Sequence, residues 1–315
     1  MYDRFAWLTG AYCLTLPHFR DIMEMTNPKG MREIMNIRIT ADSTCDLSPA
    51  QVRDNSIEIF PLFVNMGGKS YRDGVDVQPA DIFAHVAGGG ELCSTAAVPV
   101  GVYRDRFEVL SEQFDGVVHI SLGSGFSVSY QNACIAAEDL PKVRVIDSRN
   151  LSTGHGHVVM EAVRMAKTAQ DLDEMAAALR ELAPRVDTSF LLDRLDYMVK
   201  GGRCSFVTAL GANLLRLKPC IEVVDNKMIV GKKYRGNYTK CMERYVRDRL
   251  EGKDDIIYDR IFITHTPVSQ EILDTVWKTV RECGNFAEID ETSAGCTVSC
   301  HCGEGCLGVL YIHKP

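Results

Sequence analysis

The sequence lacks any long apolar run, and this absence argues against a membrane-spanning helix. The longest stretch without Asp, Glu, Lys or Arg, residues 116–137, is interrupted by a histidine, several serines and two amides. These side chains are too polar for the hydrocarbon core of a bilayer. The short apolar run 5–8 is soon broken by Thr9, Gly10 and Pro17, and no small-residue cleavage site follows. We therefore expect a cytoplasmic protein without a secretion signal or stable membrane insertion.

The sequence also lacks an excess of basic residues. It has 35 Lys and Arg against 42 Asp and Glu, a formal net charge of −7. A protein that coats nucleic acid needs a basic excess to displace phosphate counterions, so we expect no nucleic-acid partner. The 315 residues, 46% hydrophobic and 24% charged, have ordinary globular composition. This length is sufficient for two modest domains or one large domain.

Common nucleotide and hydrolase motifs are missing as well. There is no Walker A lysine pattern, and Gly123-x-Gly125 does not have the spacing of a dinucleotide fingerprint. A serine-hydrolase elbow requires glycine two positions before the nucleophile, but Leu122 stands there before Ser124. The residues alone thus favour no particular enzyme class.

Strands and helices alternate after residue 35, which predicts an α/β domain with a mainly parallel sheet. Ser48 before Pro49 is typical of a helix N-terminus. The expected strands are 36–40, 57–66, 116–122 and 143–146, and the expected helices are 47–55, 79–86, 100–114 and 127–140.

The pattern changes in the second half, where a hairpin over 219–230 and mixed strands predict an α+β domain. We expect domains 36–155 and 156–315 that share a cleft, preceded by an extension, 1–35, that need not be native because Met31 or Met35 could be the start. The other expected helices are 156–167, 171–182, 238–250 and 269–283, and the other strands are 188–192, 261–264, 286–289 and 308–312.

Three loops rich in hydroxyls are the best candidates for a binding site: 42–44, 94–97 and 121–129. Each is expected after a strand, and hydroxyls beside helix N-termini favour an anion such as a carboxylate or phosphate. Any one of these serines and threonines is also explained by helix capping. The loops therefore predict an anion-binding protein and do not identify the anion.

Ordered segments along nearly the whole chain carry a resemblance to a known family. Examples are T-A-D-S-T-C-D at 40–46, L-D-Y-M-V-K-G-G-R at 195–203 and H-C-G-E-G at 301–305; the other segments are 71–76, 94–96, 120–133, 145–148 and 218–219. In order and spacing, the set resembles the DegV family. The resemblance implies a two-domain DegV-like fold, with an N-terminal parallel-sheet α/β domain and a C-terminal α+β domain with a mixed sheet.

The DegV family binds long-chain fatty acids, and several members are the lipid-presenting subunits of a bacterial fatty-acid kinase. The resemblance therefore implies a bacterial lipid carrier that is not itself an enzyme. It implies a fatty acid held in an interdomain tunnel, a kinase catalytic subunit as partner, and neither a cofactor nor a metal.

The resemblance also implies which residues hold the carboxylate. Thr95 matches the threonine of the family's T-S motif, with Ala96 in place of the serine. Ser127 matches the serine of L-S-G-T-Y-Q, and His301 matches the histidine of H-x-G-P-G. Arg203 matches an arginine that supports the same network.

Three further positions belong to this comparison with the family: an additional ligand, a contact with the kinase and a departure from the family motif. We include Ser124 as a carboxylate ligand, and Arg235 matches a family arginine that contacts the kinase. Glu304 replaces the proline of H-x-G-P-G, which leaves the shape of that loop open.

The cysteines support a different interpretation. Most of the 12 are scattered, but Cys296, Cys300, Cys302 and Cys306 surround His301 within eleven residues. Such a cluster could bind zinc or an iron–sulfur centre, although its spacing matches no common zinc module. A metal or redox protein is therefore one alternative. A stand-alone acyl-processing enzyme that depends on Ser127 is the other.

Overall fold

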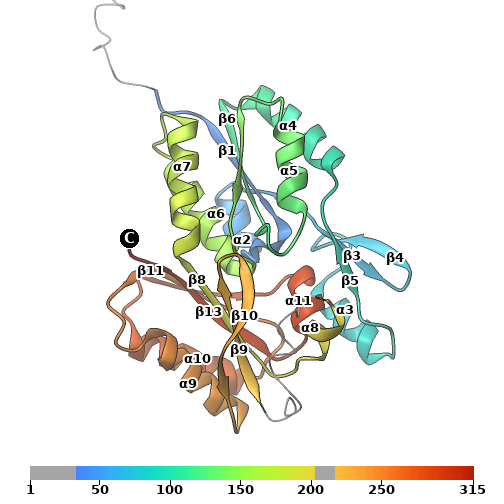
Figure 1. Ribbon diagram of the computed structural model, residues 1–315, viewed down its shortest axis with the longest axis vertical. Helices are drawn as coiled ribbons and strands as arrows, with labels where there is room; N and C mark the ends of the chain where they lie inside the picture. The colour runs from blue at the N-terminus through green and yellow to red at the C-terminus, as the bar shows by residue number, and fades with distance from the viewer. Residues whose placement is uncertain (1–32, 203–216) are drawn as a thin grey trace, which may run out of the picture. The chain divides into compact units, whose positions relative to one another are not determined.

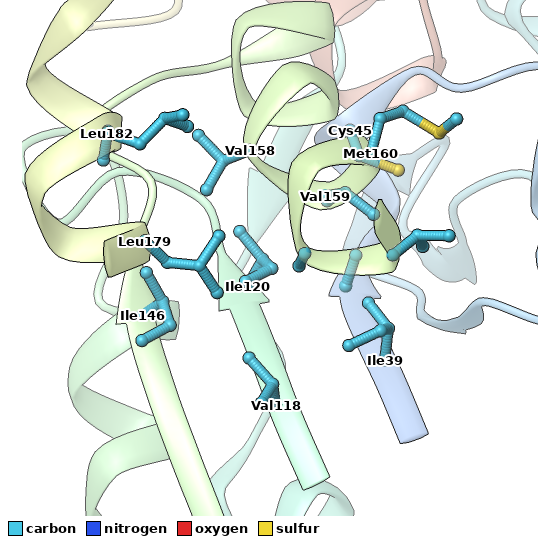
Figure 2. Packing of buried hydrophobic residues seen from close by; sticks show 14 of the residues in the cluster. Ile39, Cys45, Val118, Ile120, Ile146, Val158, Val159, Met160, Leu179 and Leu182 are labelled. Carbon is cyan, nitrogen blue, oxygen red and sulfur yellow. The ribbon is translucent and has the colours of Figure 1, made fainter. Parts of the chain in front are cut away.

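A parallel four-stranded sheet, in the order β2-β1-β6-β7, organises the first half of the protein (Figure 1). Helices cover both faces of this sheet, which explains why every residue of β6 is buried. Ile39, Val118 and Ile120 project from the strands toward α6 and α7 (Figure 2). The strands are β1 (Ile37–Asp42), β2 (Glu58–Phe60), β6 (Gly116–Ser121) and β7 (Val143–Asp147), and the helices are α4 (Val100–Gln113), α5 (Ser129–Ala137), α6 (Ser152–Ala166) and α7 (Leu172–Leu182).

The computed structural model describes residues 33–202 and 217–315, and Met35–Pro315 form one compact unit. Nearly all of the expected extension 1–35 lies outside the described residues. Within the described ranges, no helix is long and apolar enough to cross a bilayer.

A mixed six-stranded sheet, in the order β10-β9-β8-β13-β11-β12, organises the second half. Only β11 and β12 pair in parallel. Helix α6 packs against both sheets, and α9 and α10 pack with the second sheet. The strands are β8 (Val186–Leu192), β9 (Lys218–Val224), β10 (Lys227–Tyr234), β11 (Ile256–His265), β12 (Glu288–Ser293) and β13 (Cys306–His313), and the helices are α9 (Tyr238–Leu250) and α10 (Gln270–Cys283). The predicted combination of a parallel and a mixed sheet is thus confirmed, whereas the domain division at residue 155 stays a prediction.

The predicted single strand 57–66 is wrong, because it is two strands in different sheets. Pro61 separates them, since proline has no N–H to donate to a ladder. The second piece, β3 (Phe63–Met66), forms a three-stranded antiparallel sheet with β4 (Lys69–Arg72) and β5 (Ser94–Ala96). We had expected loop 94–97 to follow a strand of the parallel sheet. Most of this loop is instead β5, a strand of the separate antiparallel sheet.

Helix α11 (Cys296–Cys302) was not predicted, because its cysteines were interpreted as a loop motif. Helix α6 begins at Ser152, four residues before its predicted start at Gly156. The capping of α2 (Pro49–Asp54) by Ser48 is confirmed, and the hairpin turns at Asp225 and Asn226 as predicted. The remaining elements are η1 (Ser43–Cys45), α3 (Pro79–Ala87), η2 (Ala183–Arg185) and α8 (Asp196–Lys200).

Candidate functional site

A cavity with about 600 Å³ of empty space, part of it open to solvent, lies beside the loops predicted to bind an anion. Each of the three hydroxyl-rich loops contributes a side chain to its wall: Thr44, Thr95 and Ser127. Most of the remaining wall is apolar. The other lining residues are Leu62, Ala96, Ala97, Leu122, Phe126, Leu151, Phe190, Met198, Met228, Thr297, Val298, His301 and Cys302.

Thr95 and His301, which are 206 positions apart in the chain, form a hydrogen bond in this wall. The distance from Thr95 Oγ1 to His301 Nε2 is 2.8 Å. If the imidazole donates its Nε2 proton to Thr95 Oγ1, the hydroxyl proton of Thr95 is available to a third group. The pair can therefore present a donor to an acceptor in the cavity.

Ser127 is arranged in a similar way by the start of α5. Its Oγ accepts a hydrogen bond from the Ser129 N–H at 3.1 Å and lies 2.9 Å from Ser129 Oγ. When Ser129 donates both hydrogen bonds, the Ser127 hydroxyl proton is available to the cavity.

Thr44, in the predicted loop 42–44, is a third hydroxyl at the cavity, although the prediction did not name it as a carboxylate ligand. Its side chain is buried, and its Oγ1 has no hydrogen-bond partner among the described residues. Buried hydroxyls are normally paired, so an additional polar group at this wall would satisfy it.

Two buried aspartates attach the N-terminus of α11 to the first half of the chain. Asp73 accepts hydrogen bonds from Cys296 N at 2.9 Å and from Thr297 Oγ1 at 2.7 Å. Asp46 accepts from Gly295 N at 2.9 Å and from Ser152 Oγ at 2.6 Å. Because α11 carries His301, these contacts position the imidazole beside Thr95.

Burial has the largest effect on Asp46 and raises its pKa to about 7, although hydrogen bonds from Ser152 and Gly295 oppose the rise. Asp42, beneath loop 121–129, behaves differently. Burial would raise the pKa of Asp42, but hydrogen bonding and electrostatic attraction by the neighbouring His119 outweigh this and lower it. The Asp42 carboxylate accepts from Ser121 Oγ and Leu122 N, both at 2.8 Å, and so supports the loop that carries Ser127.

Gly201, in the predicted G-G-R segment, allows α8 to approach His301 closely. A Cβ on Gly201 would lie 2.6 Å from His301 Nδ1, well inside van der Waals contact. The adjoining Arg203 lies outside the described residues, so its predicted support of the carboxylate site stays a prediction.

Ser124 lies elsewhere in its loop and is not part of the cavity wall. Its Oγ donates to Asp147 at 2.6 Å and accepts from Asn226 Nδ2 at 2.7 Å. Asn226 is at the tip of the β9–β10 hairpin, whose Met228 lines the cavity. Ser124 thus links loop 121–129 to the hairpin that carries Met228. No local sequence pattern indicated this hydrogen bond between Ser124 and Asn226.

Arg235 is exposed at the end of β10 that is remote from Met228, roughly 20 Å along the strand. It belongs to a surface with Lys232, Lys233 and Arg244, separate from the cavity. Its predicted contact with a kinase is not tested by this position.

The four cysteines near His301 divide between two apolar clusters. Cys296 and Cys300 pack with Cys93 and Val64, whereas Cys302 and Cys306 pack with Phe190 and Met198. Burial, as the largest cause, raises the pKa of the Cys296 and Cys300 thiols, which disfavours reactive thiolates. In the described part of the chain, no group of three or more His, Cys, Asp or Glu side chains could hold a metal ion. The arrangement gives no support to the metal-protein alternative.

Sequence reasoning missed most of the apolar wall. Phe190, Met198, Met228 and Val298 come from four elements that only the tertiary structure brings together. One signal was available: residues 296–302 contain no proline or glycine, and Val298 and Cys302 are spaced as neighbours on one face of a helix.

The parallel and mixed sheets define an α/β protein, and its cavity beside the hydroxyl-rich loops is lined mainly by apolar residues. The chain belongs to the DegV family, since the profile described as "Uncharacterised protein, DegV family" matches residues 36–314. A DegV domain-containing protein of Caldanaerobacter subterraneus is 31% identical over 281 residues, which cover 88% of this chain and 99% of that protein.

Solved structures of related proteins share the fold. A fatty-acid-binding DegV family protein from Thermus thermophilus is 24% identical with a TM-score of 0.80, covering 89% of this chain and 100% of that one. A structure described as a stearic acid-binding protein from Eubacterium ventriosum is 26% identical with a TM-score of 0.74, covering 88% and 98%.

Proposed function

We propose that this protein binds a long-chain fatty acid, with the carboxylate at Thr95, Ser127 and His301 and the acyl chain among the apolar residues of the cavity. The observation that carries the proposal is the hydrogen-bonded Thr95–His301 pair at the edge of an apolar cavity that Ser127 also lines. Relatives described as fatty-acid-binding proteins add support.

The chemistry of the wall suits such a ligand. A carboxylate that leaves water must have its lone pairs satisfied, because an unpaired buried polar group costs about 1–3 kcal/mol and a charged group more. The hydroxyls of Thr95 and Ser127 can each donate one hydrogen bond, and His301 adds charge when it is protonated. Each methylene buried by the apolar wall contributes about 0.8 kcal/mol.

Two substitutions test the carboxylate site. Thr95→Val preserves the shape of the side chain and removes its hydroxyl, and Ser127→Ala removes the second donor. We expect each variant to retain less palmitate than the parent when the reloaded protein is dialysed against lipid vesicles, with a larger loss in the double variant. Ser111→Ala, in α4 and away from the cavity wall, is a control that should retain palmitate as the parent does. Full retention by the double variant would contradict the proposed site.

We further propose that the protein presents the bound acid to the catalytic subunit of a fatty-acid kinase. Support comes from the lack of a Walker A motif and from the exposed position of Ala96 at the cavity. Arg235 and its basic neighbours would meet the kinase at a surface apart from the ligand. We expect loaded protein to stimulate ATP consumption by such a subunit, and Arg235→Glu to weaken this effect without reducing lipid retention. Equal stimulation by the parent and Arg235→Glu would contradict the role of Arg235.

The Thr95–His301 hydrogen bond also resembles the hydroxyl–imidazole pairs of acyl-transfer enzymes. The acyl-processing alternative therefore has a direct test with the isolated protein and p-nitrophenyl palmitate. We expect no turnover above that of Ser127→Ala or Thr95→Val, whereas turnover that disappears in Ser127→Ala would favour the enzyme that depends on Ser127, and turnover that disappears in Thr95→Val would favour one that depends on the Thr95–His301 pair.

A further inference from the structure

Two neighbouring thiols lie directly beside the Thr95–His301 pair. Cys93 is two residues before Thr95, and Cys300 is one residue before His301 on α11. Both cysteines are free and buried, and both pack in the same apolar cluster. Cys300 Sγ donates a hydrogen bond to Cys93 Sγ. The two segments that carry Thr95 and His301 therefore meet at adjacent contacts, a hydroxyl–imidazole pair and a pair of thiols.

The two thiols differ in how readily each would react. Burial, the largest cause, raises the pKa of both thiols, so neither reacts quickly near neutral pH. The hydrogen bond between them opposes this rise at Cys93, which accepts it, and adds to the rise at Cys300, which donates it. Cys93 is therefore the thiol that ionises more readily and reacts first with an oxidant. Cys300 is placed to react second.

The chain around Cys93 permits the small movement that a disulfide requires. Hydrogen-bonded sulfur atoms must come closer to reach an S–S bond of about 2.0 Å. Cys93 lies between α3 and β5, outside regular secondary structure, and follows three glycines at 88–90. Gly89 adopts a φ of 87°, in the region that glycine favours. Because Cys300 is held within α11, we expect segment 88–93 to make the adjustment.

We propose that Cys93 and Cys300 are an oxidation site, at which hydrogen peroxide forms a disulfide that joins segment 88–93 to α11. Hydrogen peroxide is small enough to reach buried thiols when this region opens locally.

The reaction has two steps. The Cys93 thiolate attacks one oxygen of the peroxide, the O–O bond breaks, and the hydroxide that leaves takes up the proton that Cys93 released. The Cys300 sulfur then attacks the sulfur of the Cys93 sulfenic acid, the S–O bond breaks, and the hydroxide that leaves takes the Cys300 proton. Two thiols are oxidised to one disulfide, and one peroxide is reduced to two molecules of water.

The disulfide would connect the two segments that carry Thr95 and His301. It would close a long covalent loop and so disfavour the unfolded state. It would also keep Thr95 and His301 from separating, because each is within two residues of a linked cysteine. A fatty acid held by this pair should then leave more slowly. This last consequence rests on the proposed fatty-acid function, whereas formation of the disulfide does not.

The test is peptide mapping of the full-length protein treated with hydrogen peroxide. After a tryptic digest without reductant, mass spectrometry should find fragment 73–104 linked to fragment 282–315, and fragmentation should place the bond between Cys93 and Cys300. Cys300→Ala should lose this link. Cys296→Ala is the matched control, because it removes the thiol one turn earlier on α11 and should keep the link.

The same samples report the consequences of the disulfide. The oxidised parent should melt about 5 °C or more above the reduced parent and should release palmitate to vesicles more slowly. A dithiol reductant should reverse both changes. In Cys300→Ala, peroxide should not slow the release of palmitate, whereas in Cys296→Ala it should.

The outcomes separate the two proposals. The half-buried thiols of Cys134 and Cys283 show whether enough peroxide was used. If these two are oxidised to sulfinic acids while Cys93 and Cys300 remain thiols, or if the parent links Cys93 to another cysteine, the inference is wrong. A disulfide that forms without slowing the release of palmitate would contradict its effect on the site.

A parent that retains no palmitate in either state would contradict the proposed function, and the peptide map would still decide whether the disulfide forms. Should Cys300→Ala fail to fold, as judged by circular dichroism, fragmentation of the linked peptide from the parent decides.

Discussion

Replacing Gly125 with alanine should loosen the β9–β10 hairpin, which contributes Met228 to the cavity wall. A Cβ on Gly125 would lie 1.8 Å from the carbonyl oxygen of Asn226, so the hairpin tip must move. The movement would break the hydrogen bonds of Asn226 Nδ2 to Ser124 Oγ at 2.7 Å and to Asp147 Oδ2 at 3.1 Å. Each such bond contributes about 0.5–1.5 kcal/mol, so we expect a loss of about 1–3 kcal/mol in the free energy of unfolding.

This loss should appear as a decrease in melting temperature of about 2–10 °C, measured by circular dichroism. Because Met228 is near the hairpin tip and lines the cavity, Gly125→Ala should also release bound palmitate to vesicles faster than the parent. Gly101→Ala is the matched control. Gly101 lies in α4 with no atom near its added Cβ, so alanine should leave stability unchanged or raise it by up to about 1 kcal/mol.

The reasoning would be refuted if Gly125→Ala and Gly101→Ala had the same melting temperature and the same rate of palmitate release. A decrease in stability without faster release would preserve the packing argument but contradict a role of the hairpin in retaining palmitate.

Two further predictions concern the aspartates that position α11. The pKa of Asp46 is about 7 in the folded protein and near 4 when unfolded, so its contribution to stability is full below pH 4 and is lost as the pH rises to 7. Asparagine does not titrate, so the parent should lose stability relative to Asp46→Asn as the pH rises from 4 to 7. Urea titrations at several pH values measure the difference in unfolding free energy between the two proteins, and a difference that does not change with pH would contradict the raised pKa. Asp73→Ala should cost about 2 kcal/mol in stability and weaken palmitate retention, because Cys296 N and Thr297 lose their acceptor. Asp81→Ala, which removes a cap from α3, should lose stability without losing palmitate; equal retention by the two variants would contradict a link between Asp73 and the site.

Much of the architecture was predictable because local patterns and tertiary structure agree. The strand 116–121 is mostly apolar in sequence and buried along its whole length because helices cover both faces of its sheet. Ser48 before Pro49 caps its helix as expected. The break at Pro61 was missed because the apolar pattern continues across it. Helix α11 was missed because its density of thiols suggested a motif and obscured an ordinary helical spacing.

The candidate site was predictable only in part. Thr95, Ser127 and His301 line one cavity, but the resemblance to a family selected them, and the local pattern alone favoured helix capping for any single hydroxyl. Ser124 was assigned to the ligand although it holds the hairpin, because its partner Asn226 is 102 positions away. The roles of Asp46 and Asp73 likewise depend on contacts with α11 more than 220 positions away, which a single sequence does not reveal.

The most direct test of the account is mass spectrometry of the organic acids extracted from the purified full-length protein. The account predicts about one long-chain fatty acid per protein molecule, and much less in the Thr95→Val, Ser127→Ala double variant. A protein that purifies without any fatty acid and does not take one up from vesicles, or one that carries only a short polar acid, would contradict the central claim.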